Sequence, residues 1–346
     1  MMNTDFLYEM LSTPSVSGDE FVLQSKVKDY MSKHVDVTTD VIGNVYSAIN
    51  SDREVSVLMC GHIDEIGLMV VNFDGNGMIK VIKSGGIRVA TYFGQKVRII
   101  TKNGVVYGAV GVSTSLLKNK DASAEDLWID IGATSKEEAM KVVSHGDYAI
   151  LDTDYHELLN DCITARAMDD RIGAFIVLEA LLKAKENGAK IGAVAATTVG
   201  EESSMRGAYF AASRVKPKCA IAVDVTFASD APGAASEVYG DINLGGGPVL
   251  CHSSVVNREL NNRLEKAAAN INMPIQWEGA AGRTGTDADT MLKCNEGTPV
   301  ALVSIPLRYM HSPSEVGSKK DIQACIDLLA QFLVEFDENV DLNPVK

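Results

Sequence analysis

The 346-residue sequence lacks the features of exported and membrane-spanning proteins. Its longest apolar runs are interrupted by Gly, His or Asp, so none is long enough to span a bilayer. The first residues, Met1-Met2-Asn3-Thr4-Asp5, contain no basic segment followed by an apolar one, so we expect no signal peptide. These absences together predict a cytoplasmic protein with no membrane partner.

Cysteine pairs and positive charge are also scarce. None of the six cysteines forms a CxxC pair and most lie in apolar runs, which favours buried free thiols; a catalytic thiol has no support in the pattern. The 32 basic residues are outnumbered by 46 acidic ones, so the net charge is −14. Because an acidic surface repels phosphate groups, we expect no nucleic-acid partner.

The composition that remains is typical of a globular protein, with 46% hydrophobic and 23% charged residues. A chain of this length exceeds what one hydrophobic core usually serves, which predicts two domains. Between about 70 and 161 the sequence is rich in Gly and Val and has short alternating runs. We therefore predict a discontinuous catalytic domain, 1–69 and 162–346, with an inserted β-rich domain, 70–161.

Outside this insert, strand-like runs alternate with helical patterns. This alternation predicts an α/β fold with a mixed, mostly parallel sheet flanked by helices. Helices are expected at 4–11, 20–31, 135–143, 171–186, 257–270 and 320–336. Strands are expected at 55–60, 96–100, 105–110, 148–151, 191–199, 219–225 and 300–305.

Potential metal ligands follow four strands of the predicted sheet. Because ligands of open α/β sheets bind outside the carboxyl ends of the strands, we expect these side chains to meet at one edge. The groups are, in chain order, His62 with Asp64, then Glu201 with Glu202, then Asp224, then His311. A fifth group, Asp169-Asp170, begins the long helix, where a carboxylate also fits as a cap.

Each of these residues also has an ordinary structural interpretation, such as a solvated acidic pair or a helix cap. Asp224 is the strongest single candidate, because it follows an apolar run where a bare carboxylate would be costly. His62 and Asp64 flank one residue, so both project to the same side and Asp64 could orient the imidazole. Imidazoles and carboxylates together suit divalent ions: zinc first, with cobalt or manganese left open.

Five short motifs in this order resemble the tetrahedral (TET), FrvX-like family of dinuclear-metal aminopeptidases. Its members are glutamyl-aminopeptidase-like and are sometimes named endoglucanases. The motifs are Gly-His62-Ile-Asp64-Glu-Ile-Gly, Met-Asp169-Asp170-Arg, Gly-Glu201-Glu202, Val-Asp224-Val and Met-His311-Ser-Pro. The likeness extends over nearly the whole chain, including Pro14–Gly18, Trp128–Ala133 and Gly282–Ala288.

The resemblance implies a role for each matched residue. It places one metal ion between His62 and Asp224, the other between Glu202 and His311, with Asp169 bridging both. It makes Glu201 the general base, Asp64 the residue that orients His62, and Asp169–Asp170 a cis peptide. It further implies short peptides with a free N-terminus as substrates, and an insert that drives assembly into a hollow tetrahedral dodecamer.

The segment Gly282–Ala288 is the candidate wall of the substrate pocket, with Arg283, Gly285 and Thr286 as candidate binding residues. Arg283 either favours an acidic side chain or sits in a surface ion pair. Three other functions stay open: a dinuclear deacylase or carboxypeptidase on the same fold, a glycoside hydrolase that needs two carboxylates and no metal, and a non-catalytic scaffold.

Overall fold

The computed structural model describes residues 2–234 and 240–345, and its largest element is an eleven-stranded mixed sheet. Nine strands follow the order β1-β2-β12-β3-β13-β16-β17-β11-β10, and β14 and β15 branch from β16. The strands are β1 (Asp36–Thr39), β2 (Val45–Ile49), β3 (Val55–His62), β10 (His156–Glu157), β11 (Cys162–Ala165), β12 (Gly192–Thr198), β13 (Cys219–Phe227), β14 (Val249–Ser253), β15 (Gln276–Ala280), β16 (Val300–Arg308) and β17 (Glu315–Ser318).

The four central strands of this sheet, β12, β3, β13 and β16, are parallel. The strands on both sides of them pair in antiparallel fashion, apart from the parallel pair β14–β15. The predicted α/β fold with a mixed sheet is thus confirmed, and its parallel part is the part that carries the site. Continuous apolar runs suit these strands because both of their faces are buried.

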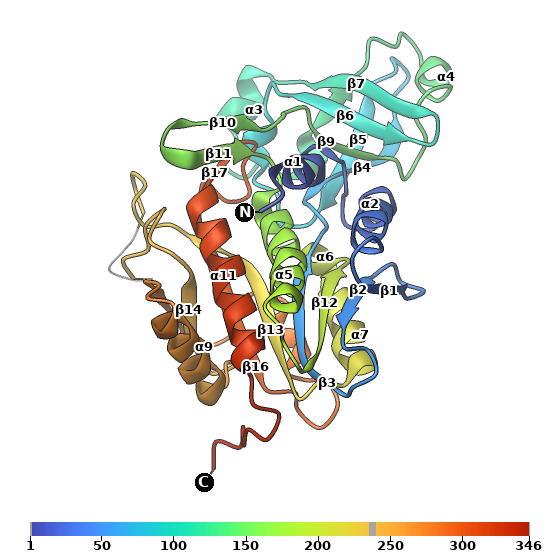
Figure 1. Cartoon of the computed structure of the whole chain (residues 1–346). Coiled ribbons are helices and arrows are strands. Elements are labelled where there is room, and N and C mark those ends of the chain that lie inside the picture. The colour runs from blue at the N-terminus through green and yellow to red at the C-terminus, as the bar shows by residue number, and fades with distance from the viewer. Residues whose placement is uncertain (1, 235–239, 346) are drawn as a thin grey trace.

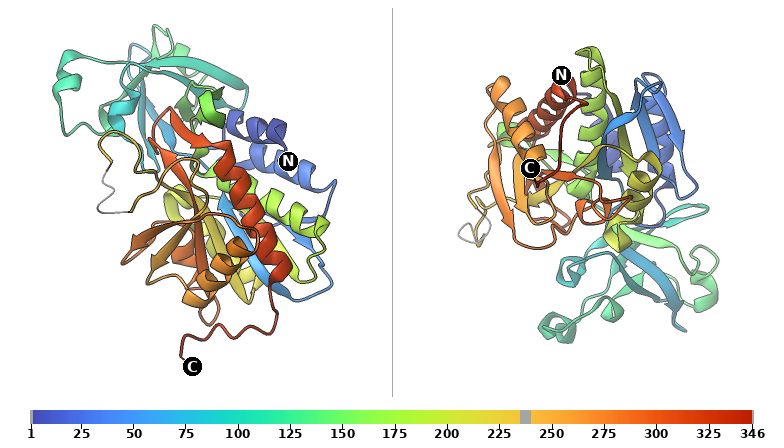
Figure 2. Two further views of the ribbon diagram at one scale, coloured as in Figure 1. Left: turned by 60° about the vertical axis from the view of Figure 1, so that its left-hand side comes forward. Right: turned by 90° about the horizontal axis from the view of Figure 1, so that it is seen from below.

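Helices cover both faces of the sheet, as Figures 1 and 2 show. The helices are α1 (Thr4–Ser12), α2 (Phe21–Met31), α5 (Met168–Glu186), α6 (Glu201–Ser204), α7 (Arg206–Val215), α9 (Arg258–Asn270), α10 (Ala288–Met291) and α11 (Lys319–Glu335). Alternate strand residues divide the core in two. Val57 and Met59 pack in the cluster with α5 and α11, whereas Leu58 and Cys60 pack in the cluster with α7.

The insert forms a small closed barrel with strand order β4-β5-β8-β7-β6-β9, which stands above one end of the sheet (Figure 1). Its strands are β4 (Gly67–Phe73), β5 (Ile79–Ser84), β6 (Lys96–Thr101), β7 (Gly104–Val110), β8 (Trp128–Asp130) and β9 (Tyr148–Leu151). Short helices connect them: η1 (Val89–Tyr92), α3 (Thr114–Lys118), η2 (Ala124–Asp126) and α4 (Lys136–Ala139). The barrel has its own apolar core, which is the property expected of an inserted domain.

The helix expected at 135–143 is shorter in the structure, where α4 ends at Ala139. The chain continues as a turn in which the Lys141 N–H bonds to the Glu138 carbonyl. The β-branched Val142 and Val143 do not favour continued helix, and Ser144 to Gly146 then form the next turn.

The six cysteines are free, and all but Cys162 are buried, as the sequence predicted.

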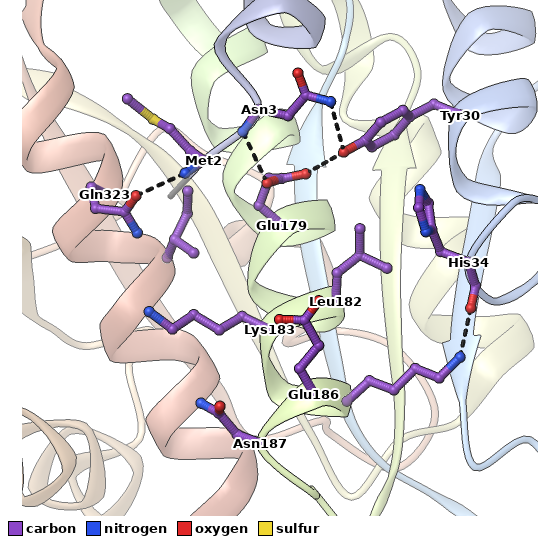
Figure 3. Close-up of a pocket in the computed structure, with 12 residues that line it drawn as sticks. Met2, Asn3, Tyr30, His34, Glu179, Leu182, Lys183, Glu186, Asn187 and Gln323 are labelled. Atoms are coloured by element: carbon purple, nitrogen blue, oxygen red, sulfur yellow. Dashed lines mark hydrogen bonds between the residues drawn. The ribbon is translucent and has the colours of Figure 1, made fainter.

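A cavity of about 560 Å³ shares no lining residue with the strand ends and lies between Met2, Asn3 and the helices α2, α5 and α11. Figure 3 shows Glu179 in its lining, where the carboxylate accepts hydrogen bonds from the Tyr30 hydroxyl and the Asn3 N–H. Among the described residues, no helix is long and apolar enough to cross a membrane.

Candidate active site

The predicted ligands converge at the carboxyl edge of the parallel strands. His62 is the last residue of β3, and Asp224 lies inside β13. Glu201 and Glu202 open α6 directly after β12, and His311 lies in the loop after β16. Because neighbouring parallel strands end at the same edge, residues far apart in sequence become neighbours here.

The side chains form two groups, each with ligand atoms within 4.8 Å of one another. One group is His62, Asp169 and Asp224, and the other is Asp169, Glu202 and His311. Asp169 belongs to both groups: its Oδ1 lies 3.2 Å from His62 Nε2, and its Oδ2 lies 3.0 Å from His311 Nε2. Two carboxylate oxygens that face two different imidazoles are what a bridging ligand requires.

Asp169 is positioned by the start of α5, where the Asp169–Asp170 peptide is cis. The neighbouring Asp170 carboxylate is fully buried and accepts hydrogen bonds from the backbone N–H groups of His62 and Gly173. Asp170 therefore ties the end of β3 to the first turn of α5. The side chain of the residue next to Asp169 thus holds the backbone of His62.

Asp64 supports three residues of the site. Its Oδ1 lies 3.4 Å from His62 Nδ1, and its two oxygens accept the backbone N–H groups of Glu201 and Glu202 at 3.0 and 3.2 Å. His62 can thus turn Nε2 toward the cluster while Nδ1 faces Asp64. Such a carboxylate behind a metal-binding imidazole fixes the ring orientation.

Glu201 belongs to neither group, although its carboxylate lies 3.9 Å from His62 Nε2. Its side chain is nine-tenths buried. Burial raises the pKa of Glu201, and the nearby carboxylates of Asp224 and Asp287 raise it further, against the opposing effect of His62. A carboxylate next to a ligand cluster but outside it is free to exchange protons.

The excess of carboxylates in the cluster favours the binding of cations. Burial and neighbouring carboxylates raise the pKa of Asp224, and the same two causes raise that of Glu202 against the effect of His311. Burial would lower the pKa of His62, but Asp169 and Asp64 outweigh it and raise that pKa well above its usual value. The cavity beside the cluster has no Lys or Arg among its described lining residues. Imidazole and carboxylate donors in this excess fit divalent metal ions.

Two buried carboxylates of the site were missed in the sequence. Glu315 accepts hydrogen bonds from the backbone N–H groups of His311 at 2.8 Å, Met168 at 2.7 Å and Asp169 at 3.2 Å. It therefore positions two candidate ligands, Asp169 and His311, that come from distant parts of the chain. In the sequence, the only feature that marks Glu315 is its position four residues after His311. Asp287 accepts from the Thr198 hydroxyl at the end of β12, although the sequence placed it only in the candidate pocket wall.

The barrel closes one side of the site. Tyr92 and Thr91 line a small cavity together with Glu202 and His311. In the loop before η1, a Cβ placed on Gly86 would lie 3.2 Å from His311 Cε1, and one on Gly85 would lie 3.2 Å from Glu202 Cβ. Glycine at these two positions therefore allows the barrel to approach the second ligand group closely.

A cavity of about 330 Å³ opens beside the cluster. Gly285 and Thr286 line it, whereas Arg283 is not among its described lining residues. Arg283 donates to Asp289 at 3.0 Å and its side chain is 74% exposed. Of the three candidate substrate residues, the structure therefore brings two to the cluster and pairs the third elsewhere.

Comparison with known proteins identifies the family. The model of the M42 glutamyl aminopeptidases matches residues 43–328. The chain belongs to this family. It is therefore a metal-dependent peptidase of the aminopeptidase type, and the predicted resemblance is confirmed.

Relatives of this M42 chain match it over nearly its full length. It is 33% identical to the lysyl aminopeptidase of Pyrococcus furiosus, over 99% of this chain and 100% of the relative. A TET aminopeptidase from a marine-sediment Thaumarchaeota archaeon has the same fold, with a TM-score of 0.90, 29% identity and 96% of each chain covered. The Pyrococcus horikoshii TET1 peptidase, described as assembling into a tetrahedron or a large octahedral shell, matches at TM-score 0.86 and 28% identity, over 96% of this chain and 99% of the other.

Proposed function

We propose that this chain removes N-terminal residues from short peptides with two divalent metal ions and Glu201 as general base. The observation that carries the proposal is the placement of Asp169 between His62 and His311, with Glu201 outside both ligand groups. One ion would be held by His62, Asp169 and Asp224, and the other by Asp169, Glu202 and His311.

When bound, such a pair of ions polarises a carbonyl oxygen and lowers the pKa of water, zinc being the first candidate and cobalt or manganese the alternatives. Glu201 accepts a proton from the attacking water and returns it to the nitrogen of the leaving amine. Asp64 accepts the backbone N–H of Glu201 and so helps to hold this residue beside the cluster. The acidic cavity also suits a positively charged α-amine, which makes an aminopeptidase a better fit than a deacylase or carboxypeptidase.

Replacing Glu201 with Gln tests this role, because the amide keeps the size of the side chain but cannot take up the proton. We expect about 10²- to 10⁴-fold lower kcat with metal content unchanged. The assay uses aminoacyl-p-nitroanilides, before and after chelation, with an N-acetylated substrate as the control for deacylase activity. Full activity of Glu201→Gln, or cleavage of the acetylated substrate alone, would refute the proposal.

The residue removed cannot be taken from the names of the relatives. The family is named for glutamyl substrates and the Pyrococcus furiosus relative for lysyl substrates, which carry opposite charges.

We also propose that the insert, 70–161, is an oligomerisation domain, and that the chain forms a homo-oligomer of the tetrahedral dodecamer type. The likeness to the TET1 peptidase supports this, and sedimentation velocity of the intact chain tests it.

A further inference from the structure

One acidic side chain of the cavity takes no part in the ligand cluster. Glu278 extends from β15 into the same cavity that His62, Asp169 and Glu201 line. Its Oε1 accepts a hydrogen bond from the Ser304 hydroxyl at 2.9 Å, and its Oε2 accepts one from the Thr226 hydroxyl. Both partners are neutral hydroxyl groups, so the carboxylate has hydrogen bonds but no counter-charge.

Strand geometry gives the distance between Glu278 and the ligand cluster. Ser304 on β16 pairs in register with Asp224 on β13, and adjacent strands lie about 4.8 Å apart. Thr226 lies two residues beyond Asp224 on the same face of β13, which is about 6.6 Å along the strand. The two residues that donate hydrogen bonds to Glu278, Ser304 and Thr226, thus lie about 4.8 Å and about 6.6 Å from Asp224, a candidate metal ligand. A substrate whose α-amine is held at the cluster can reach Glu278 with its own side chain.

Part of the cavity wall is apolar. Val225, Phe227, Leu302 and Met310 line the same cavity as Glu278. Burial raises the pKa of Glu278, whereas its two hydroxyl partners lower it. Apolar walls that end in a carboxylate suit the four-carbon stem and terminal ammonium of lysine.

The described residues that line the cavity, by contrast, include no Lys or Arg. Among the described residues, no Lys, Arg or His nitrogen lies within 4 Å of Glu278, and Arg283 is paired with Asp289. A substrate with an acidic side chain would meet Glu278 without a compensating cation. Like charges at this distance are unfavourable in a partly buried site.

We propose that Glu278 is the specificity-determining residue of this cavity and selects substrates with a cationic N-terminal side chain, lysine above all. The inference rests on the proposed aminopeptidase function, since it requires the α-amine to bind at the cluster. The side-chain ammonium supplies the missing counter-charge of Glu278, and a neutral side chain of equal length leaves that carboxylate with its two hydroxyl partners but no counter-charge.

The experiment compares lysyl- and norleucyl-p-nitroanilide, which share the unbranched four-carbon stem and differ in the ammonium. For the wild-type chain we expect kcat/KM to be at least about tenfold higher for the lysyl substrate. In Glu278→Gln that ratio should fall by about tenfold or more, with the loss falling on the lysyl substrate. Glu179→Gln is the matched control, because Glu179 also accepts a hydroxyl hydrogen bond but lies in the remote cavity (Figure 3).

A second measurement needs no variant: inhibition of the wild-type chain by free L-lysine and by free L-norleucine. Lysine should inhibit about tenfold more tightly. Equal inhibition by the two, or a lysyl-to-norleucyl ratio that Glu278→Gln leaves unchanged, overturns the role of Glu278. In either case chelator-sensitive norleucyl hydrolysis would show that the proposed aminopeptidase function survives. Loss of all free-amine hydrolysis in the wild type would instead refute that function itself.

Discussion

The two ligand groups that share Asp169 are built in different ways. The first group stands on the central parallel strands: His62 ends β3, Asp224 lies in β13, and the His62 side chain is 2% exposed. The second group is assembled from the start of α6 and a loop, where His311 has φ +61° and a side chain 26% exposed. The sheet itself fixes the first group, whereas loops and the barrel fix the second.

A buried carboxylate supports the backbone of each histidine, and this similarity makes the contrast sharper. Asp170 accepts the N–H of His62, and Glu315 accepts the N–H of His311. His62 is also paired within the sheet, to Thr198 of β12. His311 instead lies next to Gly86 of the barrel, where an added Cβ would come within 3.2 Å of its Cε1. We therefore expect the second group to respond to changes outside the catalytic sheet.

The largest effect should come from Asp169, because it is the only residue common to both groups. We expect Asp169→Asn to lose both ions and to lower kcat/KM by about 10³-fold or more. Each ion would lose a charged ligand, and with it the carboxylate that connects it to the other ion. Metal analysis by mass spectrometry, beside the peptidase assay, measures both. Asp152→Asn, which removes a carboxylate paired with Arg98 in the barrel, is the control. Retention of either ion at full occupancy would argue against a bridging role.

The next effect separates the two groups. We expect His62→Ala and His311→Ala each to lower metal content by about one ion per chain. Because His311 is more exposed, the ion of its group should leave first when the wild-type chain is chelated, giving two phases. The ion remaining in His311→Ala should then show only the slow phase, and the ion in His62→Ala only the fast phase. A single common rate in all three proteins would remove the proposed difference between the groups.

The same contrast explains which parts could be predicted from the sequence. Six residues were found because each follows an apolar strand-like run or begins a helix, and parallel strands bring such positions together: His62, Asp169, Glu201, Glu202, Asp224 and His311. Their roles remain proposals, but their proximity is a consequence of the fold. The boundary of the insert at 70 and 161 also remains a prediction, although β4 begins at Gly67 and β9 ends at Leu151.

The residues that escaped prediction act through contacts between distant segments. Glu315 bonds back to Asp169, 146 positions earlier, and nothing in its own neighbourhood indicates that. Glu278 reaches the cavity from an edge strand beyond β14. Gly86 is informative only once the barrel is placed beside His311. Local patterns show that such residues are polar or small, but only tertiary packing gives them a partner.

The smallest expected effect tests whether the barrel supports the second group. In Gly86→Ala the new Cβ would lie 3.2 Å from His311 Cε1, so the imidazole must move by a few tenths of an ångström. Because His311 is partly exposed it can yield, and we expect a cost of about 1 kcal/mol. This corresponds to roughly five- to tenfold weaker binding of the fast-released ion and a similar loss of kcat/KM at limiting metal, with the slow-released ion unaffected.

Gly75→Ala is the matched control, since its Cβ meets nothing within 4 Å and lies in a turn of the same barrel. It should leave metal binding and turnover at wild-type values. Excess metal should restore the turnover of Gly86→Ala, because the substitution displaces a ligand without removing it. If Gly86→Ala weakens both ions equally, the barrel would be acting on the site as a whole. If it weakens neither, the second group is as rigid as the first, and the loops after β12 and β16 are sufficient to hold it.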